Sequence, residues 1–275
     1  MIISIINHTS GQIKDEELQT VIRAINRQIK EDFEPYWSLG ATIRLEGRSG
    51  DTPDKQNPVD MRGDAIIYLW DKVDVDGALG YHDLNFKGIP YGFVFTSLSK
   101  EIGENWSVTL SHEVLELILD PDVNLLVAGP HPDPSQNMRT VFHWYEASDA
   151  VQAQTYFIDE VEVSNFILPL YFTEQDEYVG RNDFLGKQFN GSEILRSFNL
   201  SPGGYVGFFD PELKASVQYT LPEDEEAKRR VEIKKKAEGA RRAIRYQITT
   251  NKTIEQTMKI ARQDQVFRKR ATNPF

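Results

Sequence analysis

Residues 107–120 read SVTLSHEVLELILD, and this segment decides the fold that the sequence predicts. Most of its residues are helix-forming aliphatics, Ser107 is a residue type that caps the start of a helix, and the Asp120-Pro121 pair ends one. At about 100° per residue, one narrow arc is polar, and aliphatic side chains cover the remainder apart from Ser111. A surface helix has a wider polar face, so we expect this helix to be buried and to open only onto a cleft.

The polar arc contains one histidine and three carboxylates but no Lys or Arg. With His112 as the origin, Glu116 lies at about 40° on the wheel, Thr109 at about 60°, Asp120 at about 80° and Glu113 at about 100°. Carboxylates that cluster in this way repel one another unless a cation lies among them. The arc therefore favours a metal site, and the alternative is the ordinary polar face of a surface helix.

His112 and Glu116 lie one helical turn apart, so both side chains can bind the same metal ion. Glu113 follows the histidine and would lie beside that ion, where it could take a proton from a bound water molecule. This is the arrangement of an HExxH helix with Glu in place of the second His. We predict Glu113 as the catalytic base and His112 and Glu116 as metal ligands.

The segments around this helix predict an α+β domain. An amphipathic helix follows the first strand, three further strands precede residues 107–120, and shorter extended segments come after them. The predicted helix is Asp15–Phe33, ending before Pro35; the predicted strands are Ile2–Ile6, Ala41–Leu45, Ala65–Trp70, Tyr91–Phe95 and Thr140–Tyr145, followed by a hairpin of Tyr156–Ile158 and Val161–Phe166 and an apolar run at Tyr205–Phe209. Residues 71–90 are expected to form a loop.

The order strand, helix, three strands and then a helix with the HExxE pattern resembles the zincin metallopeptidase fold. Several stretches within residues 1–210 also resemble bacterial zincin-like proteins with an HExxE helix: Gly77–Asp83, Ser111–Glu116 with Asp120-Pro121, Tyr145-Glu146 with Asp149, Val163–Phe166, and Pro202–Tyr205. The resemblance implies a mixed β-sheet with an N-terminal helix and a buried active-site helix. It also implies an edge strand at Tyr91–Thr96 that binds an extended peptide or protein substrate, and Glu146 as the third metal ligand.

Four further residues are candidates for the site. In the resemblance, Asp149 supports the ligands, and it could orient the His112 imidazole. Asp120 is a rival ligand, but it lies two turns from His112, so we expect it to cap the helix or to support a ligand. His82 precedes the predicted edge strand and His143 lies in the segment 140–145; each could reach the ion, and core packing is the alternative for both.

The chain has no cysteine, so a metal site must use His, Asp, Glu or backbone oxygen. We expect zinc, because the helix presents few ligands and leaves coordination positions open, whereas Mn²⁺ or Fe²⁺ would also suit an oxygen-rich set. A Zn²⁺ ion with one His and two Glu ligands is neutral overall. Such a site polarises bound water less than the positively charged site with two His and one Glu.

Charge is divided unevenly along the chain. Residues 222–275 carry 15 Lys and Arg against 8 Asp and Glu, a net charge of +7, whereas residues 1–221 carry −18. We expect a zincin-like metal-binding catalytic domain at 1–221 and a basic helical tail at 222–275 that docks on this domain or on an acidic partner. The acidic domain would oppose nucleic-acid binding. With no run of 18 apolar residues and no basic leader, we expect no membrane span and a cytoplasmic protein.

Three functions remain open from the sequence. The leading hypothesis is a metal-dependent peptidase, in which metal-activated water attacks a peptide carbonyl and Glu113 transfers the proton. The alternatives are a catalytically inactive zincin-like module that binds a peptide or partner, and a metal-stabilised structural or assembly protein. An ion with an open coordination position would favour the peptidase, and full ligation by the protein, or no ion, would favour the other two.

Overall fold

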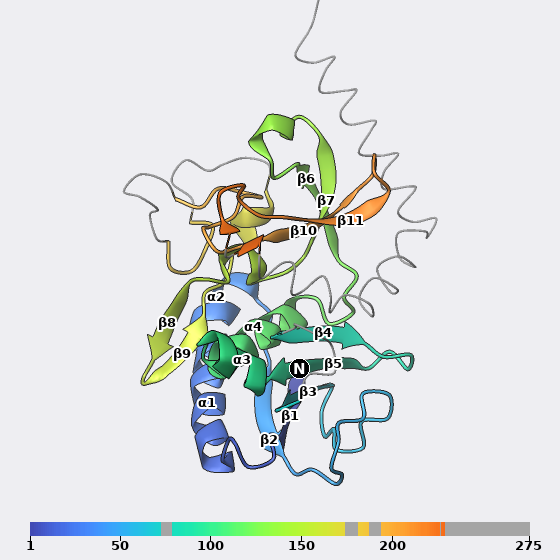
Figure 1. Ribbon diagram of the computed structural model, residues 1–275, viewed down its shortest axis with the longest axis vertical. Coiled ribbons are helices and arrows are strands. Elements are labelled where there is room, and N and C mark those ends of the chain that lie inside the picture. Colours follow the sequence, from blue (N-terminus) through green and yellow to red (C-terminus); the bar gives the residue numbers. More distant parts are fainter. Residues whose placement is uncertain (73–78, 174–180, 187–193, 226, 229–275) are drawn as a thin grey trace, which may run out of the picture.

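The computed structural model describes residues 1–225 and 227–228, apart from 73–78, 174–180 and 187–193. Within that part the chain is α+β, as predicted, with a five-stranded sheet, a four-stranded sheet and a two-stranded hairpin. The five-stranded sheet and the longer helices occupy the lower half of Figure 1, and the four-stranded sheet occupies the upper half. The predicted tail helix lies outside the described residues except for its first few positions.

The five-stranded sheet has the strand order β2-β1-β3-β5-β4. Its strands are β1 (Ile2–His8), β2 (Thr42–Glu46), β3 (Ala65–Trp70), β4 (Gly80–Leu84) and β5 (Pro90–Phe95). β2, β1, β3 and β5 run parallel to one another, and β4 pairs with β5 in the antiparallel direction at the edge. β1 and β3 are buried on both faces, which is why they read as continuous apolar runs in the sequence.

Two longer helices pack on one face of this sheet. The helices are α1 (Asp15–Arg27), a π-helical segment (Gln28–Phe33), α2 (Glu34–Trp37), α3 (Thr96–Ile102) and α4 (Trp106–Leu119). α1 contacts β2, and α4 contacts β4 and β5. The predicted helix Asp15–Phe33 corresponds to α1 and the π-helical segment together, and Pro35 lies in the first turn of the separate helix α2, where the missing N–H costs no hydrogen bond.

Helix α4 is enclosed on both sides. It lies between the five-stranded sheet and the hairpin of β8 (Thr155–Ile158) and β9 (Val161–Ser164), and β9 also contacts α1. Every residue from Ser107 to Leu119 is buried, so the prediction of a helix buried in the core is confirmed. Figure 1 shows this layering of sheet, helices and hairpin.

Polar side chains on the hairpin side of α4 are satisfied by neighbouring elements. Ser111 Oγ donates to Gln28 Oε1 at 2.7 Å and accepts the Ser164 N–H at 3.1 Å. Ser107 does not cap the helix as predicted, because the N-cap position is two residues earlier, at Asn105. Its hydroxyl instead donates to the Glu162 carbonyl at 2.7 Å, which ties the start of α4 to β9.

The four-stranded sheet is antiparallel and has the order β11-β10-β7-β6. Its strands are β6 (Leu126–Pro130), β7 (Thr140–Trp144), β10 (Val206–Asp210) and β11 (Ala215–Tyr219), and short 3₁₀ helices span Pro134–Gln136, Asp149–Val151 and Pro169–Phe172. The sequence predicted segments close to β7, β8, β9 and β10, but it did not predict β6 or β11.

The edge of the five-stranded sheet differs from the prediction. β4 lies within residues 71–90, which were expected to form a loop, and it occupies the edge. Tyr91–Thr96 is therefore not an edge strand: β5 is flanked by β3 and β4, and Thr96 already begins α3. The segment was mistaken for a loop because His82 and Asp83 are polar, although both are almost fully buried.

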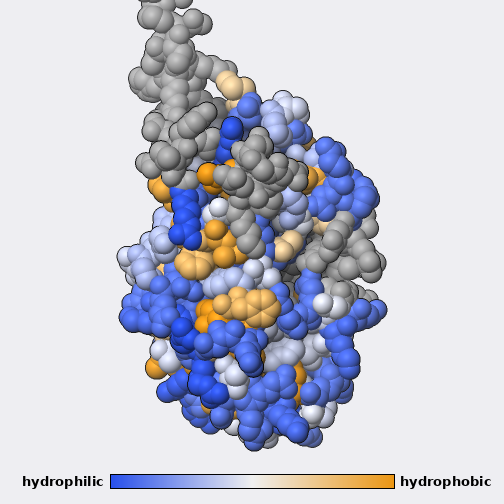
Figure 2. Space-filling view, turned by 90° about the vertical axis from the view of Figure 1, so that its left-hand side faces the viewer, coloured by the Kyte–Doolittle hydropathy of each residue, from blue (hydrophilic) through white to orange (hydrophobic). Residues whose placement is uncertain are grey.

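An aromatic cluster covers the other face of this sheet, around Tyr68, Tyr81, Tyr91, Phe93 and Phe95. Lys55 holds the loop after β2 against this face, because its Nζ lies 5.7–5.9 Å from three of these ring centroids and donates to the Tyr81 hydroxyl at 3.1 Å. Figure 2 shows a largely hydrophilic outer surface with scattered apolar patches. Among the described residues, no helix combines the length and the apolar character that crossing a membrane requires.

Candidate metal centre

Two histidines and four carboxylates converge where β4, α4 and the segment after β7 meet. All six side chains are almost completely buried, with exposures between 1% and 7%, and they are His82, His112, Glu113, Glu116, Glu146 and Asp149. Each was a candidate from the sequence. The structure brings them together from three separate elements, so the site depends on tertiary packing and not on the helix alone.

His112 faces two carboxylates with the same ring nitrogen. Its Nε2 lies 3.2 Å from Glu116 Oε2 and 3.2 Å from Asp149 Oδ1. Donors bound tetrahedrally at about 2.0–2.1 Å from a zinc ion lie about 3.3 Å from one another, so this spacing fits three ligands of one ion. Asp149 faces the same ring nitrogen as Glu116, whereas a residue that orients the imidazole would contact the other nitrogen.

His82 contacts three carboxylates of the cluster. Its Nδ1 is 3.2 Å from Glu113 Oε2 and 3.7 Å from Glu116 Oε2, and its Nε2 is 3.7 Å from Glu146 Oε2. Glu146, the predicted third ligand, therefore lies beside His82, whereas Asp149 lies beside His112. Two triads have ligand atoms that all lie within 4.8 Å of one another: His112, Glu116 and Asp149, and His82, Glu113 and Glu116.

Burial and neighbouring carboxylates disfavour the ionised form of Glu116. Burial raises the pKa of Glu116, the Asp149 and Glu146 carboxylates raise it further, and the His112 ring opposes this shift. The Ser148 backbone N–H donates to Glu116 Oε1 at 3.2 Å, which leaves Oε2 directed towards the histidines. A divalent cation beside Oε2 would compensate this charge, and the imidazole and carboxylate donors fit such an ion.

Asp120 and His143 have structural roles. The Asp120 carboxylate accepts the backbone N–H groups of Asn124 and Leu125 at 3.1 and 2.9 Å, so it caps the turn after α4, as expected. Burial and, second, the Glu146 carboxylate raise its pKa. His143 lies in the second sheet, where its Nε2 donates to the Pro130 carbonyl at 2.8 Å, and burial lowers its pKa to about 4. The structure does not bring His143 into the cluster.

Gly80 allows β4 to approach α4. A Cβ atom at this position would lie 2.8 Å from Thr109 Cγ2 and 2.9 Å from both Cγ and Oε1 of Glu113. Only a residue without a side chain therefore fits at the start of β4, two positions before His82. A narrow cleft of about 30 Å³ lies at the same point, lined among others by Gly80, His112, Glu113 and Gln152. The sequence did not predict this role for Gly80, although Gly80 lies within the stretch Gly77–Asp83 that carries part of the resemblance.

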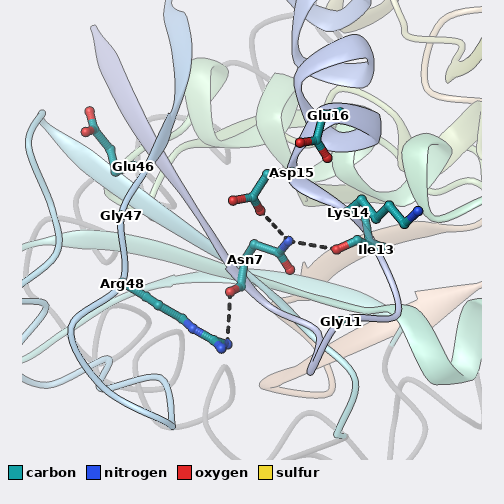
Figure 3. Close-up of a pocket in the computed structure, with 9 residues that line it drawn as sticks. All are labelled: Asn7, Gly11, Ile13, Lys14, Asp15, Glu16, Glu46, Gly47 and Arg48. Carbon is teal, nitrogen blue, oxygen red and sulfur yellow. Dashed lines mark hydrogen bonds between the residues drawn. The ribbon is translucent and has the colours of Figure 1, made fainter.

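A larger cavity of about 380 Å³ lies elsewhere, at the carboxyl ends of β1 and β2 and the start of α1. Figure 3 shows Asn7 at its centre, donating to the Ile13 carbonyl at 2.9 Å and to Asp15 Oδ1 at 2.8 Å, while Arg48 donates to the Asn7 carbonyl at 3.3 Å. These contacts fasten the loop before α1. The cavity contains acidic and basic side chains but none of the six residues of the cluster.

Comparisons of this chain with protein-family models, with curated proteins and with solved structures found no match in any of the three.

Proposed function

We propose that this protein is a metal-dependent hydrolase that cleaves peptide bonds. The observation that carries the proposal is the placement of His112 Nε2 at 3.2 Å from both Glu116 and Asp149. This spacing fits three ligands of one tetrahedral ion. Three protein ligands would leave a coordination position for water, which is the arrangement of a catalytic ion and not of a structural one.

The residues of the cluster divide into two roles. His112, Glu116 and Asp149 would hold the ion, with zinc preferred and Mn²⁺ or Fe²⁺ also compatible with two carboxylates. When bound, the ion would polarise a water molecule and a substrate carbonyl. Glu113 lines the cleft beside His112, and its Oε2 is 3.2 Å from His82 Nδ1. We assign Glu113 as the group that takes the proton from water and passes it to the leaving amine.

The edge strand β4 supports a peptide as substrate. It runs antiparallel to β5 and contacts α4, and residues Leu79 and Gly80 at its start line the cleft. β4 is the last strand in the order of this sheet, so an extended peptide that pairs with it would bring one carbonyl to the cleft. In a zincin-like arrangement, β4 takes the place that we first predicted for Tyr91–Thr96.

A non-catalytic, metal-stabilised protein is the second candidate. The narrow cleft, about 30 Å³, favours it, because a substrate backbone must widen the entrance before it reaches the ion. A neutral centre with one His and two carboxylates would also activate water less than a positively charged one. In that case the ion would link α4 to the segment after β7 without turnover.

Two substitutions on adjacent turns of α4 separate these functions. Glu113→Gln keeps the size of the side chain but removes the base, so we expect hydrolysis in a peptide library to fall by roughly two to four orders of magnitude. Its metal content, measured with one equivalent of added zinc, should stay unchanged. Glu116→Gln should instead weaken metal binding. Glu104→Gln, in the same cleft, is the matched control and should retain hydrolysis and metal.

The outcomes are distinct. If the wild-type protein and Glu113→Gln cleave the same peptide equally fast, Glu113 is not the base. If the metal-loaded wild-type protein cleaves no member of the library, the non-catalytic function is favoured. Unchanged metal content in Glu116→Gln and in His112→Ala would place the ion elsewhere.

A further inference from the structure

The second triad of the cluster is not used as a metal site by the proposed reaction. His82 Nδ1 lies 3.2 Å from Glu113 Oε2 and 3.7 Å from Glu116 Oε2. The three ligand atoms lie within 4.8 Å of one another, and all three side chains are almost fully buried. An imidazole nitrogen and two carboxylate oxygens in this arrangement are a donor set for a divalent transition metal.

The two triads share only Glu116. The shared atom is Oε2, which is 3.2 Å from His112 Nε2 and 3.7 Å from His82 Nδ1, while Oε1 accepts the Ser148 N–H. A single carboxylate oxygen that faces two imidazoles is placed to bridge two ions. In two-metal hydrolases the ions lie about 3.5–4 Å apart, which is compatible with such a bridge.

Four buried carboxylates lie in this cluster: Glu113, Glu116, Glu146 and Asp149. The first ion uses only Glu116 and Asp149 as ligands, so Glu113 remains as an anionic ligand for a second ion. Repulsion between the ions should nevertheless make the second bind more weakly than the first.

We propose that His82, Glu113 and Glu116 form a second, weaker site for a divalent transition-metal ion such as Zn²⁺ or Co²⁺. The site deepens the proposed function, because it shares Glu116 with the first ion and uses the residue assigned as the base. A Glu113 carboxylate bound to an ion no longer accepts the proton of water. The second ion therefore inhibits hydrolysis, and the protein is active with one ion and inhibited with two.

Metal binding to the full chain tests this inference without any substrate. Metal-free protein is titrated with Co²⁺, bound metal is counted by equilibrium dialysis with elemental analysis, and the visible Co²⁺ absorption follows each step. We expect two ions per wild-type chain, bound in two phases. His82→Asn should bind one, because the Asn amide can still donate to Glu113 but is a poor metal ligand. Glu113→Gln should also lose the second phase and keep the first.

His131→Asn is the matched control, because His131 lies next to the second sheet and its Nδ1 accepts the Asp133 N–H, a contact that Asn can replace. This variant should still bind two ions. Saturation of the wild-type chain at one ion, or a second phase that persists in both His82→Asn and Glu113→Gln, would overturn the inference. Absence of hydrolysis alone would contradict only the proposed function, because ion counting does not depend on turnover.

Discussion

Replacing Gly80 with alanine tests the close approach of β4 to α4. The new Cβ would lie 2.8 Å from Thr109 Cγ2 and 2.9 Å from Glu113 Cγ, distances at which something must shift. Overpacking of this kind costs about 1–3 kcal/mol. Alanine also lowers the conformational entropy of the unfolded chain, which stabilises the folded protein by about 0.4–1 kcal/mol. We expect a net loss of roughly 0.5–2.5 kcal/mol in the free energy of unfolding, or a melting temperature lowered by about 1–10 °C.

Gly47→Ala is the matched control. A Cβ at Gly47 meets no atom within 4 Å, so this variant should be as stable as the wild type or slightly more stable. Urea unfolding of both metal-free variants, followed by circular dichroism, measures the difference. Equal stability of the two variants would show that β4 does not pack against α4 as described. Because the shift would also separate His82 from Glu113, Gly80→Ala should weaken the second Co²⁺ phase more than the first.

Two further predictions concern the second sheet and the tail. Burial lowers the pKa of His143 to about 4 in the folded chain, against 6.5 for an ordinary histidine. Between these pH values the unfolded state binds more protons than the folded state, so the free energy of unfolding falls as the pH falls. Between pH 7 and pH 4 the free energy of unfolding of the wild type should fall by about 3 kcal/mol more than that of His143→Gln. Urea unfolding at both pH values measures this difference, and equal pH dependence of the two proteins would contradict the burial of this ring. For the basic tail, limited proteolysis should release residues after Leu221 more readily at high salt, because screening weakens charge contacts, and equal protection at all salt concentrations would indicate apolar packing instead.

The sequence predicted the parts of the fold that depend on local periodicity. α4 and β3 follow from patterns that neighbouring residues determine, and burial of α4 followed from its narrow polar arc. β4 could not be predicted in this way, because His82 and Asp83 give it the composition of a loop. Its strand conformation depends on pairing with β5 and on the absence of a side chain at Gly80, and both are tertiary features.

In the candidate site, too, the features set by local geometry could be predicted and those set by tertiary structure could not. The adjacency of His112 and Glu116 follows from helical geometry and could be predicted from their spacing. The sequence could not predict which carboxylate lies beside this pair. Glu146 and Asp149 lie close together in the sequence, and the path of the chain after β7 decides which one faces His112. That path places Asp149 beside His112 and Glu146 beside His82.

The convergence of three distant segments on Glu116 has a consequence for folding in a chain without cysteine. The ion held by α4 and the segment after β7 would cross-link these two segments as a disulfide does in other proteins, by closing a long loop, and the second ion would join β4 to α4. Unlike a disulfide, this cross-link would resist reductants and yield to chelators. The donors meet only after the three segments have docked, so uptake of the ion would be a late step in folding, and its removal would speed unfolding far more than it would slow refolding.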